Sequence, residues 1–179
     1  ILAGNALMYG SDVIRQKYLI PMTAGEKIGC FATTEPTASS ELSSRALKTI
    51  AEKKGDKFVV NGQKRFITNA PVADHVAALV NIDGKLSALV IELNSPGCSV
   101  GEPDKKLGNR GQLTADIYFD NVEVPAENLI GEEGKGLHVA LGTLTYGRVG
   151  IGATGVGMAQ SAFDECIEYM KHREAFGKK

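Results

Sequence analysis

The feature that most constrains the fold is a series of short apolar segments, separated by turn residues, which occupies residues 26–129. Asn61-Gly62 and Asp83-Gly84 each stand between two such segments, and Gly55-Asp56 precedes the first of these. Because such pairs tolerate the positive φ angles of a two-residue turn, Asn61-Gly62 and Asp83-Gly84 predict β-hairpins, and Gly55-Asp56 predicts another turn. Short strands at this spacing are typical of an antiparallel β-sandwich or β-barrel. The predicted strands lie at residues 57–60, 63–67, 76–82, 86–93, 98–101 and 115–124.

Helical patterns flank this β region on both sides. Ser11-Asp12 predicts a helix start, and Pro21 with Gly25 predicts the helix end. After a polar turn at residues 131–136, apolar residues recur every three or four positions, which predicts a second helix. We therefore expect an α+β multidomain chain, in which an antiparallel β barrel or sandwich is flanked by α-helical segments. The expected divisions are the end of a helical domain at 1–24, a β domain at 25–131 and the start of another helical domain at 132–179.

Composition argues against several functional classes. The net charge of −1 offers no basic surface for nucleic acid or for an anionic membrane. No apolar run approaches the roughly 20 residues that span a bilayer, and there is no signal-peptide pattern. Cys30, Cys98 and Cys166 are far apart, so we expect reduced thiols in the bacterial cytoplasm or the mitochondrial matrix. The histidines have no metal-ligand spacing, and we expect no metal site.

Two glycine-rich stretches match phosphate-binding patterns only superficially. Residues 150–155 fit G-x-G-x-x-G, but a Rossmann turn needs a preceding strand and a second strand with an acidic residue about 20 positions later. A helix with small residues explains this stretch better. Residues 131–136 lack the Gly-Lys-Ser/Thr of a P-loop and carry two acidic residues, so they predict a loop that enters a helix.

Two polar strand ends are candidates for binding a planar ligand. The segment at residues 31–41 runs out of a predicted strand into small and hydroxyl residues, which can bind a polar ring or phosphate oxygens. The segment Phe66-Ile67-Thr68-Asn69 offers an aromatic ring and a hydroxyl group. Taken alone, the first is better explained as an ordinary polar loop, and the second is explained at least as well as a strand end with a turn. Arg148 interrupts a small, apolar stretch and is a candidate for an anion contact.

A set of short segments in a fixed order gives these candidates a context. The segments lie at residues 16–21, 31–40, 66–69, 96–97, 106–110, 119–125, 128–131, 147–148 and 173–178. No single segment is decisive, but their order and spacing together resemble the acyl-CoA dehydrogenase family over nearly the whole chain. The resemblance implies a middle β domain between two helical domains, with FAD bound on a face of the β domain.

The resemblance also implies roles for individual residues. Thr34 would hydrogen-bond the pyrimidine side of the flavin, Thr68 would approach flavin N5, and Phe66 would pack against the ring. The other FAD-binding residues implied are Phe31, Thr33, Ser39, Ser40, Arg173 and Phe176, of which the last two often touch the FAD of a neighbouring subunit. The substrate-binding residues implied are Ser40, Thr145, Gly147 and Arg148.

The activity implied is FAD-dependent α,β-dehydrogenation of an acyl-CoA to a trans-2-enoyl-CoA, with electrons passed to an electron-transfer flavoprotein. A homo-oligomer, either a dimer or a tetramer, is also implied. We expect the chain to be a fragment that lacks the catalytic glutamate, which the family usually carries downstream of Lys179. In a minority of members the base precedes the Arg148 position, but here that residue is Gly147. We therefore expect the isolated chain to be inactive.

Two alternative functions remain open at this point. One is a flavin oxidase or monooxygenase on the same scaffold, and the other is a non-catalytic flavin-binding member. The chain also departs from the family pattern, since Thr37 and Ser39 replace usual glycines, Glu41 replaces a usual aspartate and Phe66 replaces a usual tryptophan. If Thr37 and Ser39 need positive φ, each substitution costs about 1 kcal/mol or more.

Overall fold

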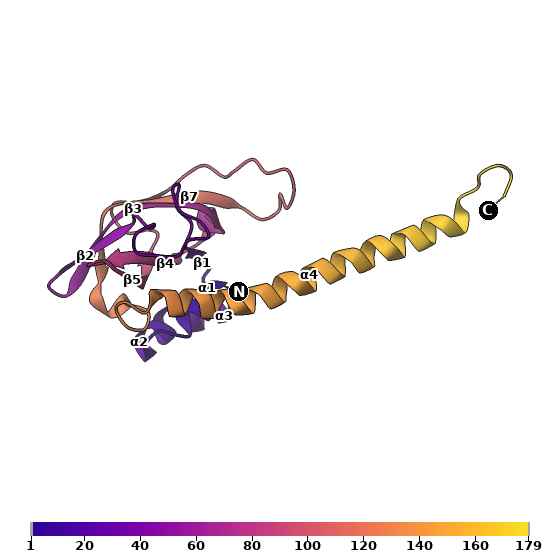
Figure 1. Cartoon of the computed structure of the whole chain (residues 1–179). Helices are drawn as coiled ribbons and strands as arrows, with labels where there is room; N and C mark the ends of the chain where they lie inside the picture. Colours follow the sequence, from indigo (N-terminus) through magenta and orange to yellow (C-terminus); the bar gives the residue numbers. More distant parts are fainter. Residues whose placement is uncertain (1, 179) are drawn as a thin grey trace. The chain divides into compact units, whose positions relative to one another are not determined.

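The computed structural model describes residues 2–178, and the chain divides into two compact units, Ile1–Leu144 and Thr145–Lys179. The first unit contains a curled β-sheet with short helices packed on one face (Figure 1). The second unit contains the continuation of helix α4 (Gly136–His172) and a short turn after it. No helix among residues 2–178 is both long and apolar enough to cross a membrane.

The first unit also contains the following elements. Its helical elements are α1 (Leu2–Leu7), α2 (Asp12–Ile14), the π-helical turn η1 (Arg15–Leu19), α3 (Ile20–Thr23) and the 3-10 turns η2 (Ala70–Val72) and η3 (Ala126–Asn128). Its strands are β1 (Gly29–Ala32), β2 (Ile50–Lys54), β3 (Lys57–Thr68), β4 (His75–Ile82), β5 (Lys85–Glu92), β6 (Cys98–Val100) and β7 (Thr114–Pro125).

The expected fold class, a β domain flanked by helical segments, is confirmed. The strand order is β1-β4-β2-β3-β7-β6, and β5 pairs with β4. Most pairs are antiparallel, as predicted, but β1 and β2 run parallel to β4. The sheet is therefore mixed, because the long connection after β1 returns the chain in the same direction.

The helix start predicted at Ser11 is confirmed. The Ser11 hydroxyl accepts a hydrogen bond from the backbone N–H of Ile14 at 3.4 Å, which caps the first turn of α2. The end predicted at Pro21 is wrong, because the helical run from α2 through η1 continues past Pro21 to Thr23, the last residue of α3. Gly25 follows the last helical turn and ends this helical region.

The hairpin predicted at Asn61-Gly62 is wrong, whereas those at Gly55-Asp56 and Asp83-Gly84 are present. Strand β3 continues through Asn61-Gly62, with a register shift against β7 between Val60 and Gly62, and its hairpin with β2 turns at Gly55-Asp56. Gly62 is needed for a different reason: a Cβ there would lie 2.6 Å from the Cα of Thr49, and its φ is +148°. The glycine therefore permits the close approach of another segment, not a turn.

Strand β4 divides two hydrophobic cores because its side chains alternate between the faces of the sheet. Val76, Ala78 and Val80 face one core, which is enclosed by β1, β2, β3, β5 and β7. Ala77 and Leu79 face the other core, where α1, α2 and the first turns of α4 cover the sheet. Packing therefore buries both faces of β4.

Residues 150–155 lie within helix α4, so the Rossmann alternative is excluded. A dinucleotide-binding turn needs a strand immediately before the glycines, and here helix precedes and follows them. Within the first unit, α4 starts in close contact with β5: a Cβ on Gly136 would lie 2.7 Å from the backbone of Ser87. The side chains of residues 145–178 are mostly exposed.

Candidate functional site

The loop that leaves β1 is attached to β3 by backbone and side-chain hydrogen bonds. The Thr34 carbonyl accepts from the backbone N–H of Arg65 at 2.9 Å. The Lys64 ammonium donates to the Thr33 carbonyl at 3.5 Å and to the Glu35 carboxylate at 2.8 Å. These contacts bring the polar end of β1 against the last residues of β3, although the two are about 30 residues apart in sequence.

Glu35 and Lys64 form a buried ion pair beneath this loop. Their side chains are 2% and 0% exposed, respectively. Glu35 also accepts hydrogen bonds from the backbone N–H groups of Lys48 at 2.5 Å and Thr49 at 3.1 Å. The carboxylate therefore has several donors, which is the condition under which a buried charge is tolerated.

Burial and pairing shift both pKa values of this pair. Burial lowers the pKa of Lys64 to about 8, although Glu35 partly opposes that shift. Burial alone would raise the pKa of Glu35, but the Lys64 ammonium and the N–H donors lower it below its ordinary value. Near neutral pH both groups are thus charged, and the loop is held by an ionic contact.

A β-bulge lies at the end of β3. The pairing with β7 passes from Lys64↔Ile117 to Ile67↔Ala115, so Arg65 and Phe66 together stand opposite Asp116. Simple alternation would place residues 64 and 66 on the same face. Because of the extra residue, Lys64 and Ile67 are both buried, whereas Phe66 is 57% exposed.

The residues predicted to bind flavin fall into two groups. Phe31, Thr33, Thr34, Phe66 and Thr68 lie in the first unit, at the adjacent ends of β1 and β3. Phe31, Thr33, Thr34 and Thr68 are partly exposed. Strand pairing and the loop contacts therefore gather an aromatic ring and several hydroxyl groups at one edge of the sheet.

Ser39 and Ser40 follow a tight turn and are exposed. The turn is closed by reciprocal backbone hydrogen bonds between Glu35 and Ala38, at 2.7 and 3.2 Å. Neither Thr37 nor Ser39 has a positive φ, so replacing glycine at these positions causes no left-handed strain. The expected cost at these two positions is therefore absent.

The remaining predicted residues lie in the second unit and are described within it. Thr145, Gly147 and Arg148 lie on helix α4, where Thr145 and Arg148 are exposed and Gly147 is partly exposed. Arg173 follows the end of α4, and its backbone N–H donates to the Tyr169 carbonyl at 2.9 Å. Phe176 is fully exposed and has a φ of 54°.

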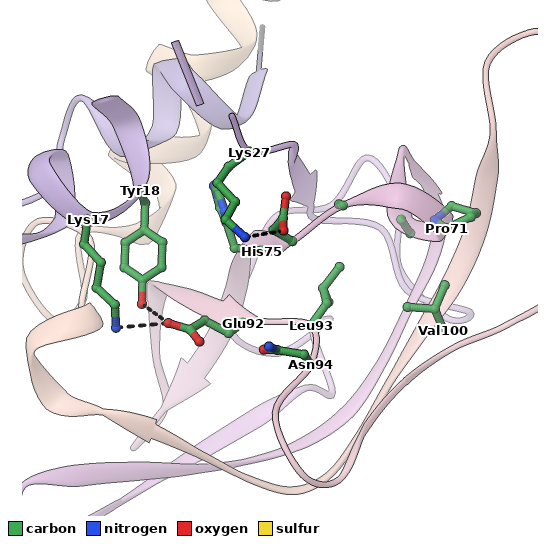
Figure 2. Close-up of a pocket in the computed structure, with 12 residues that line it drawn as sticks. Lys17, Tyr18, Lys27, Pro71, His75, Glu92, Leu93, Asn94 and Val100 are labelled. Carbon is green, nitrogen blue, oxygen red and sulfur yellow. Dashed lines mark hydrogen bonds and ion pairs between the residues drawn. The ribbon is translucent and has the colours of Figure 1, made fainter. Parts of the chain in front are cut away.

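A separate pocket of about 440 Å³ lies between η1 and the sheet (Figure 2). Its charged side chains are paired: Lys17 with Glu92 at 3.0 Å, and Lys27 with Asp74 at 2.7 Å. The Tyr18 hydroxyl also donates to Glu92 at 3.0 Å. These contacts pair the charged side chains of the pocket, whereas the buried Nε2 of His75 in its wall has no hydrogen-bond partner. None of the residues predicted to bind flavin lines this pocket.

Three residues that support the site were given no role from the sequence: Glu35, Lys64 and Asp116. Glu35 lies within the predicted segment at residues 31–41, but its partner Lys64 is distant in sequence, as is the Arg65 partner of Asp116. The one available signal is the polar run Gln63-Lys64-Arg65, which precedes the apolar pair Phe66-Ile67. Among residues 2–178, no group of three or more histidine, cysteine, aspartate or glutamate side chains is placed to hold a metal ion.

Comparison with known families agrees with this arrangement. Residues 30–122 match the model of the acyl-CoA dehydrogenase middle domain, and residues 134–179 match that of the acyl-CoA dehydrogenase C-terminal domain. The chain is 43% identical to a short-chain specific acyl-CoA dehydrogenase from Clostridium acetobutylicum, over 95% of this chain and 46% of that protein. It is 39% identical to a subunit of the caffeyl-CoA reductase–Etf complex from Acetobacterium woodii, over 100% of this chain and 48% of that protein.

Solved structures show the same fold. Butyryl-CoA dehydrogenase from Megasphaera elsdenii superposes with a TM-score of 0.93 at 36% identity, over 99% of this chain and 48% of that one. A glutaryl-CoA dehydrogenase from Mycobacterium smegmatis, in complex with FADH2, gives a TM-score of 0.90 at 31% identity, over 97% of this chain and 44% of that one. The chain thus spans about half the length of the relatives it matches. Because residues 30–122 and 134–179 both match models of this family, the chain belongs to the acyl-CoA dehydrogenase family of flavoprotein oxidoreductases.

Proposed function

We propose that the edge formed by the ends of β1 and β3 binds the ring system of FAD. The observation that carries this proposal is the exposed Phe66 at the end of β3, next to Arg65, whose N–H binds the Thr34 carbonyl. The loop that carries Thr34 is held against β3 by the buried Lys64–Glu35 pair. An exposed aromatic face suits a planar ring, and threonine hydroxyls with backbone groups suit its polar edge. The FADH2 complex of the Mycobacterium smegmatis relative supports the same cofactor.

The residues of this chain would hold and tune the cofactor. A bound flavin supplies the acceptor for a hydride from the substrate. Hydrogen bonds from Thr34 at the pyrimidine side would stabilise negative charge that develops there, and Thr68 would orient the central ring. Phe31 and Thr33 would complete the wall, and Ser39 and Ser40 would meet the pyrophosphate or the CoA arm.

The whole protein is proposed to oxidise an acyl-CoA to a trans-2-enoyl-CoA and to pass electrons to an electron-transfer flavoprotein. The names of the Clostridium acetobutylicum and Acetobacterium woodii relatives support the substrate class and this partner. Thr145, Gly147 and Arg148 are the proposed substrate contacts on α4. Positioning of the CoA arm would fix the reacting carbons and lower the entropic barrier.

The base that removes the substrate proton is proposed to be a glutamate in the part of the protein that follows Lys179. Two observations support this assignment: Gly147 has no side chain to act as a base, and Glu35 is committed to its ion pair with Lys64. Arg173 and Phe176 are proposed to contact the FAD of a neighbouring subunit in a homo-oligomer. Their exposure in the second unit is consistent with such a role.

Titration of the purified protein with FAD tests the proposed site. We expect Thr34→Val, Thr68→Val and Phe66→Ala each to weaken FAD binding by about tenfold, the factor that corresponds to about 1.4 kcal/mol. Thr23→Val, which changes an exposed threonine on α3, is the matched control and should bind like the unmodified protein. Equal affinities for all four variants would contradict the assignment of the site.

Enzyme assays of the whole protein test the proposed reaction. Bleaching of the flavin by an acyl-CoA, with electrons passed to an artificial acceptor, is expected for a dehydrogenase. Steady-state oxygen consumption without an acceptor would instead identify an oxidase. A flavin that no acyl-CoA reduces would contradict both activities.

A further inference from the structure

Phe66 has a backbone conformation that is unfavourable for its residue type. Its φ is 59°, in the left-handed region, where a side chain with a Cβ costs about 1–2 kcal/mol relative to ordinary geometry. The residue lies in the bulge opposite Asp116, and most of its ring is exposed. Burial of the ring therefore does not compensate for the strain, and another interaction must hold this conformation.

The side chain of Asp116 supplies that interaction. One carboxylate oxygen accepts the backbone N–H of Phe66 at 3.3 Å. The other accepts the Gln63 amide at 2.9 Å and the Arg65 guanidinium at 3.2 Å. The Asp116 side chain is 13% exposed and that of Arg65 is 43% exposed, so solvent screens the carboxylate less than the guanidinium.

Asp116 also fixes the Phe66 ring indirectly, through Arg65. The Arg65 guanidinium carbon lies 4.7 Å from the centroid of the Phe66 ring, within the range of a cation–π contact. The same guanidinium is bound to Asp116. The Asp116 carboxylate thus binds both the backbone N–H of Phe66 and the Arg65 guanidinium that lies over the Phe66 ring.

We propose that Asp116 is the positioning residue that sets the Phe66 ring and the Arg65 guanidinium as one rigid plate for stacking against the flavin. The proposal rests on the proposed flavin site and extends it to a residue of β7 that has no assigned role. Without the bulge, β3 would be a regular strand, and residue 66 would lie on the same face as the buried Lys64. The bulge and its carboxylate direct Phe66 outwards instead.

The chain contains no tryptophan, so Phe66→Trp introduces a single fluorescent reporter at the position of interest. In this background we would compare Asp116→Ala, Asp116→Asn and the matched control Asp120→Ala, an exposed aspartate on the same strand. Two quantities would be measured: quenching of the reporter by acrylamide without FAD, and the Kd for FAD. Thermal unfolding would confirm that each variant is folded.

We expect Asp116→Ala to increase acrylamide quenching and to raise the Kd for FAD by about tenfold. Asp116→Asn keeps an acceptor for the Phe66 N–H but loses the charge that holds Arg65, so it should give intermediate values. If Asp116→Ala does not fold, Asp116→Asn decides the question alone. Folded Asp116 variants with the same quenching and the same Kd as Asp120→Ala would overturn the proposal.

The two readouts separate this proposal from the proposed flavin site. Acrylamide quenching reports on the position of residue 66 without any flavin. If FAD does not bind to the protein with Asp116 intact, the flavin site is refuted, while the quenching data still decide whether Asp116 positions residue 66. If FAD binds equally well to all variants but quenching differs, Asp116 holds residue 66 without serving the flavin, and the proposal fails.

Discussion

The buried Lys64–Glu35 pair predicts a large loss of stability when one partner is removed. Lys64→Met keeps most of the apolar side chain but removes an ammonium that is 0% exposed. The Glu35 carboxylate then remains buried and faces the backbone N–H groups of Lys48 and Thr49. Breaking a buried pair in this way costs about 3–5 kcal/mol, a large part of the roughly 5–15 kcal/mol that stabilises a typical protein.

Urea unfolding at pH 7 and 25 °C, followed by circular dichroism, measures this loss. With a slope of about 2 kcal/mol per molar urea, the midpoint should fall by about 1.5–2.5 M. Lys57→Met is the matched control, because the Lys57–Glu123 pair is close, at 2.6 Å, but is 41% and 63% exposed. Removing an exposed pair costs about 0–1 kcal/mol, so its midpoint should shift little.

The pH dependence gives an independent check, because its sign reverses in the variant. In the unmodified protein the pKa of Glu35 lies below its ordinary value of 4.5, so its contribution to stability is complete above pH 4.5 and is lost as the pH falls below it. In Lys64→Met, burial is retained without the cation, and the pKa of Glu35 should rise above 4.5. Protonation of Glu35 then relieves the buried charge, so the free energy of unfolding of the variant should increase as the pH falls from 7. A variant that loses less than 1 kcal/mol, or keeps the original pH slope, would refute the reasoning.

Three further predictions concern other parts of the first unit and the free thiols. Phe66→Gly should raise the free energy of unfolding by about 1 kcal/mol, because glycine tolerates φ > 0, while it weakens FAD binding; urea unfolding and FAD titration check this. Gly62→Ala should cost about 2 kcal/mol or more, visible as a lower Tm, because its Cβ would meet Thr49 at 2.6 Å. Cys30, whose pKa burial raises to about 12, should resist a thiol reagent at pH 8, whereas the exposed Cys166 should react; mass spectrometry after labelling distinguishes them.

Turn residues predicted a hairpin correctly where they form the turn itself. Asp83-Gly84 is a hairpin because both residues have positive φ and the flanking strands pair from Ile82↔Lys85 onwards. Asn61-Gly62 has an equally strong turn signature, but it lies inside β3. There the glycine accommodates Thr49, and the Asn61 side chain accepts the backbone N–H of Asn121 on β7 at 2.8 Å. The same dipeptide thus serves a long-range contact that the sequence does not reveal.

In the candidate site, too, residues in local motifs were predicted and residues that act through long-range contacts were not. The resemblance to the family identified Thr34, Phe66 and Thr68 as flavin contacts, and these remain predictions. Lys64 and Asp116, which hold the site, were missed, because Lys64 meets Glu35 across 29 positions and Asp116 meets Arg65 across 51. A lysine in a strand ordinarily indicates a solvated face, and burial of its charge becomes visible only when the partner carboxylate is located.

Four consecutive residues of β3 combine several unfavourable features. Lys64 buries a charge, Arg65 and Phe66 form a bulge, Phe66 has a left-handed φ, and Ile67 returns to the core. Along β4, by contrast, pattern and packing agree, as expected for a sequence with consistent local and global preferences. A natural sequence retains strain where an exposed side chain must be held in a set direction. Relief of the strain at Phe66 should therefore stabilise the protein and weaken flavin binding together, whereas strain without a functional purpose would affect stability alone.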